Sequence, residues 1–380
     1  MKAQPLITVY IPYYNDAKFL RKSIDSVLGQ SYKNFELILL NHATTDNCRE
    51  IAHSYNDNRI KHIDMPRNEG GGGGMLFATM LNNASGKYIK PLCADDMMRP
   101  NCLETMVDFM ESHPDIDFAF GDVEYIDENG RDLHDSWFKS RPGFDIKDDA
   151  ADLIRKYSDG GSMLPYIGNI SKRNIFTSIQ IEKTFVMMFD MSLWLQLLCK
   201  GYNIGYINEK VCNYRIHSGQ MSSIDKEAIS GYMSWFEWAS YFQYTMGINS
   251  IDLAKKVFPN SVYANNLSDV KDIPFFIAHE MYNKHKPLFD IPLVKMLNDD
   301  ETRERLMKHF GFGVKELREL RKSDFHINWP ITSKGLKQKI YCLQPQNINM
   351  FGLAFLMLRR LIKVITLDKF RHRHRKKYSL

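Results

Sequence analysis

Two adjacent carboxylates, Asp95 and Asp96, follow a short apolar run that begins at Tyr88 and are the residues best suited to chemistry. In an α/β sheet, ligands bind beyond the carboxyl ends of the strands. Carboxylates placed there suit a hard divalent cation, which takes oxygen ligands and shares them with substrate phosphates. The same residues also fit a capped turn that leads into a helix at Pro100.

Five consecutive glycines, Gly70 to Gly74, precede a predicted helix start. Glycine lets the backbone approach a phosphate closely, and a helix amino end favours negative charge. The spacing matches neither a dinucleotide fingerprint nor a Walker loop. A connector without a ligand is therefore the plainer interpretation of this run.

Three further positions carry groups that suit catalysis, each with a structural alternative. Asp190 stands at a predicted helix start, where it is either a general base or an N-cap. Arg215 and His217 suit a pyrophosphate, or simply form a surface turn. Cys93 fits a small apolar filler better than a thiolate ligand.

The elements that position these residues alternate between strand and helix. This alternation predicts an α/β fold with a doubly wound, mostly parallel sheet and helices on both faces. Strands are predicted over 7–11, 35–40, 60–63, 88–92, 116–120, 204–207 and 211–214, and helices over 16–28, 75–83, 100–110 and 190–200. Residues 122–162 are polar and acidic, and few elements are expected there. The predicted domains are 1–225, a mainly helical region over 226–345, and an apolar helix with a basic tail over 346–380.

The composition is that of a globular protein with room for two domains: 380 residues, 44% hydrophobic and 25% charged. No signal peptide is expected, because the chain leads directly into a strand. The six cysteines show no metal-binding spacing and are interpreted as reduced thiols. A cytosolic protein is therefore predicted.

The net charge of +5 is concentrated near the C-terminus, where residues 359–377 hold nine basic residues and one acid. The apolar stretch 350–367 is interrupted by Arg359, Arg360 and Lys363, so it falls short of the roughly 20 residues that span a bilayer. An apolar helix beside a basic cluster favours an anionic membrane surface. A core helix is the alternative. Nucleic-acid binding through the tail is a rival function, but the mildly acidic body shows no aromatic-basic patch.

Several ordered motifs together resemble one known family. They are Tyr10–Asn15, Thr44–Asp46, Ala84–Ile89, Cys93–Asp96, Phe189–Trp194 and Tyr214–Ser218. In this order they are similar to a family 2 glycosyltransferase of the GT-A fold, and the resemblance covers residues 5–225. It implies an inverting enzyme that moves a sugar from a nucleotide-diphosphate donor, expected to be a UDP-sugar, to a hydroxyl of a growing bacterial surface glycan such as capsule or lipopolysaccharide. A lipid-linked acceptor would suit attachment at the inner face of the cell membrane.

The resemblance also implies a role for each matching position. Pro12 and Tyr14 would border the base, Asn41 and His42 would meet the base and ribose, and the loop with Asn68 and Gly70 would offer backbone amides to the donor. Asp95 with Asp96 would hold Mn²⁺ or Mg²⁺, Asp190 would be the general base, and Arg215 and His217 would lie near the diphosphate or acceptor.

The chain departs from the family pattern at four positions. Asn41 and His42 replace two aspartates, Cys93 replaces the first acid of the metal motif, and Phe189 replaces the glutamate before the base. These departures leave open a rival interpretation, a nucleotide-sugar-binding protein with weakened catalysis.

Overall fold

A computed structural model describes residues 4–70, 73–141, 143–159, 164–186, 188–220, 237–238 and 240–322. The chain forms two compact units that divide between Pro259 and Asn260.

The first unit holds nine described strands and eight described α-helices. The strands are β1 (Ile7–Tyr13), β2 (Phe35–Asn41), β3 (Ile60–Asp64), β4 (Tyr88–Pro91), β5 (Met97–Met98), β6 (Phe118–Ile126), β7 (Asp132–Ser136), β8 (Asn169–Lys172) and β9 (Ile204–Arg215). The helices are α1 (Ala17–Leu28), α2 (Cys48–His53), α3 (Gly73–Leu81), α4 (Cys102–Ser112), α5 (Trp137–Ser140), α6 (Ala150–Ser158), α7 (Phe189–Cys199) and α9 (Ile251–Val257).

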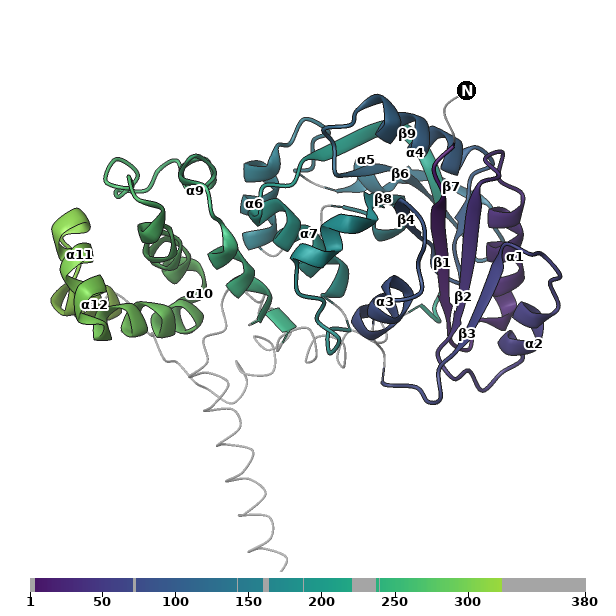
Figure 1. The fold of residues 1–380 in the computed structure, drawn as a ribbon, viewed down its shortest axis with the longest axis horizontal. Coiled ribbons are helices and arrows are strands. Elements are labelled where there is room, and N and C mark those ends of the chain that lie inside the picture. The colour runs from purple at the N-terminus through teal and green to yellow at the C-terminus, as the bar shows by residue number, and fades with distance from the viewer. Residues whose placement is uncertain are drawn as a thin grey trace, which may run out of the picture. The chain divides into compact units, whose positions relative to one another are not determined.

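All nine strands form one mixed sheet with the order β3-β2-β1-β4-β8-β6-β9-β5, and β7 pairs with β6 outside this path. β1 is parallel to β2 and β4, β2 is parallel to β3, and β6 is parallel to β9. β8 is antiparallel to both β4 and β6, so β4 and β6 point the same way. The predicted α/β fold with a mostly parallel sheet is confirmed (Figure 1).

Both faces of the sheet are covered, as the continuous apolar strands predict. Alternate residues of β1, Ile7, Val9 and Ile11, are fully buried in the core that α1 and α4 also line. Tyr10 points to the other face, where its ring lies 6.0 Å from the ring of Phe77 on α3. Figure 1 shows α1 and α2 on one side of β1–β3, and α3 and α7 on the other.

The structure differs from the sequence prediction in the middle of the unit. The two predicted pieces 204–207 and 211–214 form the single strand β9, because β9 pairs with β6 along its length and a register shift beside Asp122 absorbs the polar residues between them. β6 likewise runs on to Ile126. The expectation of few elements over 122–162 was wrong, since β7, α5 and α6 lie there. Their stability comes from contacts with β6, α7 and α9, which no local pattern reports.

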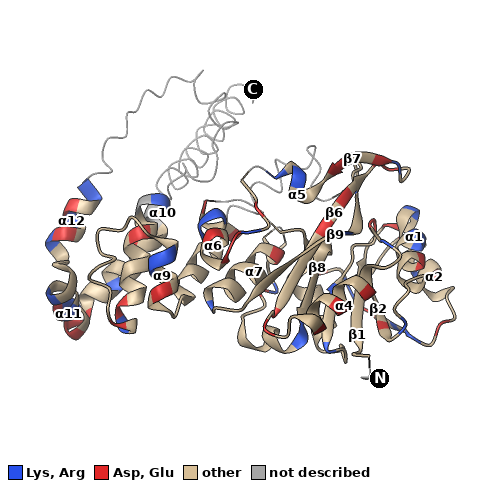
Figure 2. Ribbon diagram, turned by 90° about the horizontal axis from the view of Figure 1, so that it is seen from above, with Lys and Arg blue, Asp and Glu red and all other residues tan. Residues whose placement is uncertain are grey.

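The described part of the second unit is helical, which confirms the predicted helical extension. It contains α10 (Ile273–Asn298), α11 (Asp300–Phe310) and α12 (Val314–Lys322). Buried Asp272 accepts hydrogen bonds from Arg305 Nε at 2.8 Å and His309 Nδ1 at 2.6 Å, which ties the start of α10 to α11. Basic and acidic segments alternate along α11 and α12 (Figure 2).

Among the described helices, none is both long and apolar enough to cross a membrane. The predicted apolar helix and basic tail over 346–380 lie outside the described residues.

Candidate functional site

Most of the predicted site residues lie at or just beyond the ends of strands that point the same way, whereas Asp190 lies on α7. β1, β2, β4 and β9 end at Tyr13, Asn41, Pro91 and Arg215. Their shared direction places these ends at one edge of the sheet, the edge where α/β proteins bind ligands. Residues spread over more than half the chain therefore meet there.

The turn after β4 carries the metal-binding candidates. Ligand atoms of Cys93, Asp95 and Asp96 all lie within 4.8 Å of one another, and they form the one such group found among the described residues. Asp96 is 1% exposed, and its Oδ2 atom has no hydrogen-bond partner within the described parts of the chain. Burial and then the charge of Asp95 raise the pKa of the Asp96 carboxyl well above its ordinary value. A cation would relieve this repulsion, so the residues fit a hard divalent metal.

Two residues at the end of β9 and just beyond it, Arg215 and His217, contact the Asp95–Asp96 turn. His217 Nε2 lies 3.0 Å from Asp95 Oδ2, and the imidazole side chain is 8% exposed. The Arg215 backbone N–H donates to Asp96 Oδ1 at 2.8 Å. Arg215 and His217 thus contact the Asp95–Asp96 turn, although 119 to 122 residues of sequence separate the bonded pairs.

The charges of several acidic side chains act on the thiol of Cys93. Burial first, and then the carboxylates of Asp96, Asp95, Asp16 and Asp190, raise the pKa of the Cys93 thiol well above its ordinary value. The thiol therefore stays protonated at neutral pH and is a poor ligand for Mg²⁺ or Mn²⁺. Cys93 therefore adds no negative charge to that of the four carboxylates.

Asp190 occupies the first turn of α7 but does not cap it, because the N-cap residue is Met188. Its Oδ1 accepts a hydrogen bond from the Met191 N–H at 2.8 Å. Burial raises the pKa of the Asp190 carboxyl to about 6, despite this hydrogen bond, which lowers it. A carboxylate with that pKa is mostly ionised at pH 7 and more basic than a solvated aspartate, as a general base requires.

A second group of contacts lies at the ends of β1 and β2. The rings of Tyr14 and His42 are 6.1 Å apart, and Tyr14 is 41% exposed. The Glu69 N–H donates to His42 Nε2 at 3.0 Å, which holds the loop containing Asn68 and Gly70 beside His42. Burial lowers the pKa of His42, so its imidazole is neutral at pH 7.

Asn41 is buried, and both ends of its amide are engaged. Its Nδ2 donates to Asp64 Oδ1 at 2.9 Å, and its Oδ1 accepts from the Thr44 N–H at 2.8 Å. The side chain therefore fixes the turn after β2 to β3. Asp64 was not predicted as a site residue, and its sequence position at the end of a strand was the available signal.

The glycine run packs against α7 and the loop before it. A Cβ on Gly73 would lie 2.6 Å from the Phe189 ring, and a Cβ on Gly74 would lie 1.9 Å from the Glu182 carbonyl oxygen. Gly70 has a positive φ of 90°, and its N–H donates to Asn68 Oδ1 at 2.7 Å. Close packing thus explains Gly73 and Gly74, whereas Gly70 serves a turn.

Asp16, which lies between β1 and α1, was not among the predicted site residues. Its side chain makes no cap hydrogen bond and instead accepts from the Tyr14 N–H at 3.4 Å. Burial and then the charge of Asp95 raise its pKa to about 6. Asp16 therefore links the Tyr14 group to the Asp95 group. Its place just after a strand, like that of Asp95, was the overlooked signal.

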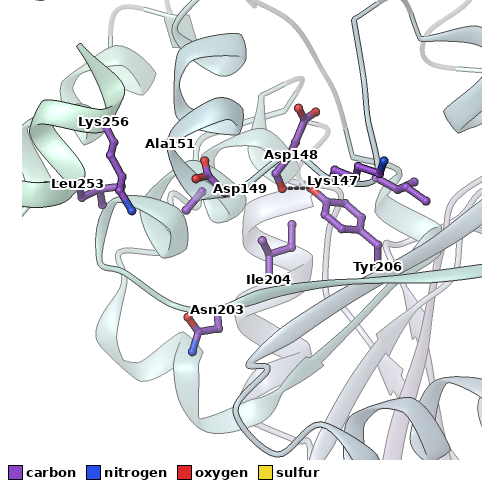
Figure 3. Close-up of a pocket in the computed structure, with 11 residues that line it drawn as sticks. Lys147, Asp148, Asp149, Ala151, Asn203, Ile204, Tyr206, Leu253 and Lys256 are labelled. Carbon is purple, nitrogen blue, oxygen red and sulfur yellow. Dashed lines mark hydrogen bonds between the residues drawn. The ribbon is translucent and has the colours of Figure 1, made fainter. Parts of the chain in front are cut away.

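A cavity of about 450 Å³ lies elsewhere in the same unit, between α6, α9 and the start of β9. Figure 3 shows its lining, where the Tyr206 hydroxyl donates to the Asp148 carbonyl oxygen at 3.2 Å. Asn203 and Ile204 stand at the opposite end of β9 from Arg215. This cavity is therefore separate from the carboxylate site.

Several proteins similar to this chain are described as glycosyltransferases. An uncharacterized glycosyltransferase from Methanocaldococcus jannaschii is 31% identical over 60% of this chain and 78% of its own length. The putative teichuronic acid biosynthesis glycosyltransferase TuaG from Bacillus subtilis is 28% identical over 61% of this chain and 87% of its own length. The chain spans 31% and 21% of the length of two longer Rickettsia glycosyltransferases.

A solved structure of residues 1–349 of S. aureus TarS in complex with UDP-GlcNAc is 15% identical, with a TM-score of 0.49, and the match covers 84% of this chain and 93% of that fragment. The model of the family described as "Glycosyl transferase family 2" matches residues 8–171, which run from β1 through the Asp95–Asp96 turn to β8. With that match, and with most of the archaeal relative covered at 31% identity, the chain belongs to glycosyl transferase family 2.

Proposed function

We propose that this protein transfers a sugar, with inversion, from a nucleotide-diphosphate donor to a hydroxyl of a surface-glycan acceptor. The observation that carries the proposal is the group of Cys93, Asp95 and Asp96 in the turn after β4, together with buried Asp190, whose charge also raises the pKa of the Cys93 thiol. Displacement of a nucleoside diphosphate requires charge compensation on the leaving group and a base for the acceptor proton. The carboxylates around Cys93 are suited to both tasks.

Asp95, with Asp96 beside it, would hold Mn²⁺ or Mg²⁺, and His217 Nε2 is close enough to Asp95 to join them. When bound, such a cation stabilises negative charge on the departing diphosphate. The neutral Cys93 thiol leaves this work to the carboxylates. Tyr14, His42 and the loop with Asn68 and Gly70 would border the nucleotide.

Asp190 would take the proton of the acceptor hydroxyl as that oxygen bonds to the anomeric carbon and the bond to the diphosphate breaks. A single carboxylate base with a direct displacement gives inversion at that carbon. Its pKa of about 6 suits this role. Phe189, in place of the family's glutamate, packs against Phe77 and Tyr166 and helps hold the first turn of α7.

The acceptor class follows the name of TuaG, a putative teichuronic acid biosynthesis enzyme. A glycan carried on a membrane lipid would suit the basic C-terminal tail, and the protein would then work at the inner face of the membrane without crossing it. We propose a UDP-sugar as donor, without contact to nucleic acid.

The competing candidate is a nucleotide-sugar-binding protein that has lost turnover, which the neutral thiol of Cys93 favours. A screen of UDP- and GDP-sugars, with release of nucleoside diphosphate as the readout and with Mn²⁺ or a chelator present, separates the two. Metal-dependent release with one donor is expected. Donor binding without release under any condition would instead support the binding protein.

A further inference from the structure

Arg215, expected from its motif to lie near the diphosphate or acceptor, is 1% exposed and already engaged by protein groups. Its Nε donates to the Asp95 carbonyl oxygen at 2.8 Å. Its Nη1 donates to the carbonyl oxygens of Asp127 and Glu128, each at 3.1 Å. The guanidinium thus joins the turn after β4 to the turn between β6 and β7.

Two more contacts make Arg215 the meeting point of four segments. Its backbone N–H holds Asp96 Oδ1, and its Cζ lies 5.0 Å from the ring centroid of Phe19 on α1, a cation–π distance. Lys18 of α1 forms an ion pair with Glu128, which fixes the β6–β7 turn from a second side. The backbone of the metal-binding turn is therefore supported by β9, α1 and the β6–β7 turn together.

We propose that Arg215 is a positioning residue that holds the Asp95–Asp96 turn in its metal-binding conformation and does not itself bind the donor. The inference rests on the proposed function. Binding the Asp95 carbonyl fixes the peptide that carries the Asp95 carboxylate, and His217 then sets the direction of that carboxylate. A residue that binds the donor would need free N–H groups at an accessible surface. Nε and Nη1 of Arg215 are occupied, and Nη2, which has no hydrogen-bond partner within the described residues, is buried.

The chemistry explains why arginine stands at this position. A planar guanidinium donates in several fixed directions at once, so it can serve carbonyl oxygens on two different turns. A lysine keeps the charge but concentrates its donors at one point. Arg215→Lys therefore removes the bridge between the turns while the backbone bond to Asp96, which needs no particular side chain, remains available.

The test measures metal and nucleotide binding separately in the full-length protein. Mn²⁺ alone is titrated by electron paramagnetic resonance, and UDP is titrated by calorimetry in chelator and in Mn²⁺. Arg215→Lys should raise the Kd for Mn²⁺ about tenfold or more, the scale expected for buried charge-assisted hydrogen bonds. Its affinity for UDP in chelator should match that of the wild type.

Arg99→Lys is the matched control, because Arg99 binds the Glu124 side chain in the same unit at 2.6 Å and makes no bond to the Asp95–Asp96 turn. It should leave the Kd for Mn²⁺ within about twofold of wild type, as expected for a partly exposed ion pair. A wild-type Kd for Mn²⁺ in Arg215→Lys, together with lost UDP binding in chelator, would make Arg215 a donor ligand and overturn the proposal while the proposed function stands. If the wild-type protein releases nucleoside diphosphate from a donor but binds no Mn²⁺, the proposed function does not involve Mn²⁺. The positioning role of Arg215 in metal binding would then also be excluded.

A second variant keeps the proposal testable if Arg215→Lys does not fold. Lys18→Ala combined with Glu128→Ala removes an exposed ion pair that fixes the same turn, so folding is not at risk. The Kd for Mn²⁺ should rise about twofold to fivefold, the range for an exposed ion pair. An unchanged Kd in that double variant would show that the β6–β7 turn does not support the metal-binding turn.

Discussion

At the scale of single residues, burial raises the pKa of three carboxylates of the site, Asp96, Asp190 and Asp16. Asp190 and Asp16 both have a pKa raised to about 6, and Asp190 is the one proposed as general base. A general base works only when ionised, so activity should fall tenfold per pH unit below pH 6 and level off above about pH 7. The profile of kcat against pH checks this.

Asp190→Asn keeps the size of the side chain and removes its basicity. We expect kcat to fall about a hundredfold or more, the usual scale for loss of a general base, with donor affinity unchanged. Asp149→Asn is the matched control, since Asp149 caps α6 with its side chain and asparagine caps equally well. Near-normal turnover of Asp190→Asn would reduce Asp190 to a structural role.

Asp95→Asn should abolish the enhancement of donor binding by Mn²⁺, because it removes one of the two carboxylates proposed to hold the cation. Calorimetry of UDP binding with and without Mn²⁺ measures that enhancement. Cys93→Ala is the matched variant and should be mild, since the thiol it removes is protonated at neutral pH. Normal Mn²⁺-dependent activity in Asp95→Asn would refute the metal assignment.

At the scale of elements, the contact between α3 and the loop before α7 depends on the absence of a side chain at Gly74. A Cβ there would lie 1.9 Å from the Glu182 carbonyl oxygen, which is backbone and cannot simply rotate away. Gly74→Ala should therefore lower the free energy of unfolding by about 1–3 kcal/mol, the typical cost of overpacking.

Thermal unfolding of Gly74→Ala, followed by circular dichroism, measures this effect. Gly247→Ala is the control, because a Cβ on Gly247 would meet no atom within 4 Å and the residue has no positive φ. Equal melting temperatures for the two variants would contradict the packing role of Gly74.

At the scale of the whole molecule, the basic residues of 359–377 are predicted to attach the protein to anionic membranes. Each basic residue near an anionic surface contributes about 1 kcal/mol, and salt screens that attraction. The protein should sediment with anionic vesicles at low salt and be released from them at high salt. It should not sediment with neutral vesicles. Truncation after Asn347 should end this binding and spare donor hydrolysis; a truncated protein that still sediments would exclude the tail as the anchor.

The sequence by itself determined the class of fold, most strands of the sheet and the family, because short local patterns of residues indicate each of them. Short runs of apolar and β-branched residues mark β1 and β2 within a window of a few residues. The order of short motifs then identified the family without any knowledge of contacts. Asp95, Asp190 and His217 were likewise recognised as candidates from their motifs.

Only the tertiary structure decided how these residues act on one another. The contacts of Arg215 with Asp95 and Asp96, the link of Asp16 to Asp95, and the raised pKa of Asp190 depend on segments brought together across the chain. Local periodicity carries no information on which distant turns share an edge of the sheet, or on how deeply a carboxylate is buried. The pairing of β9 with β6, which sets the position of Arg215, is a contact of that long-range kind.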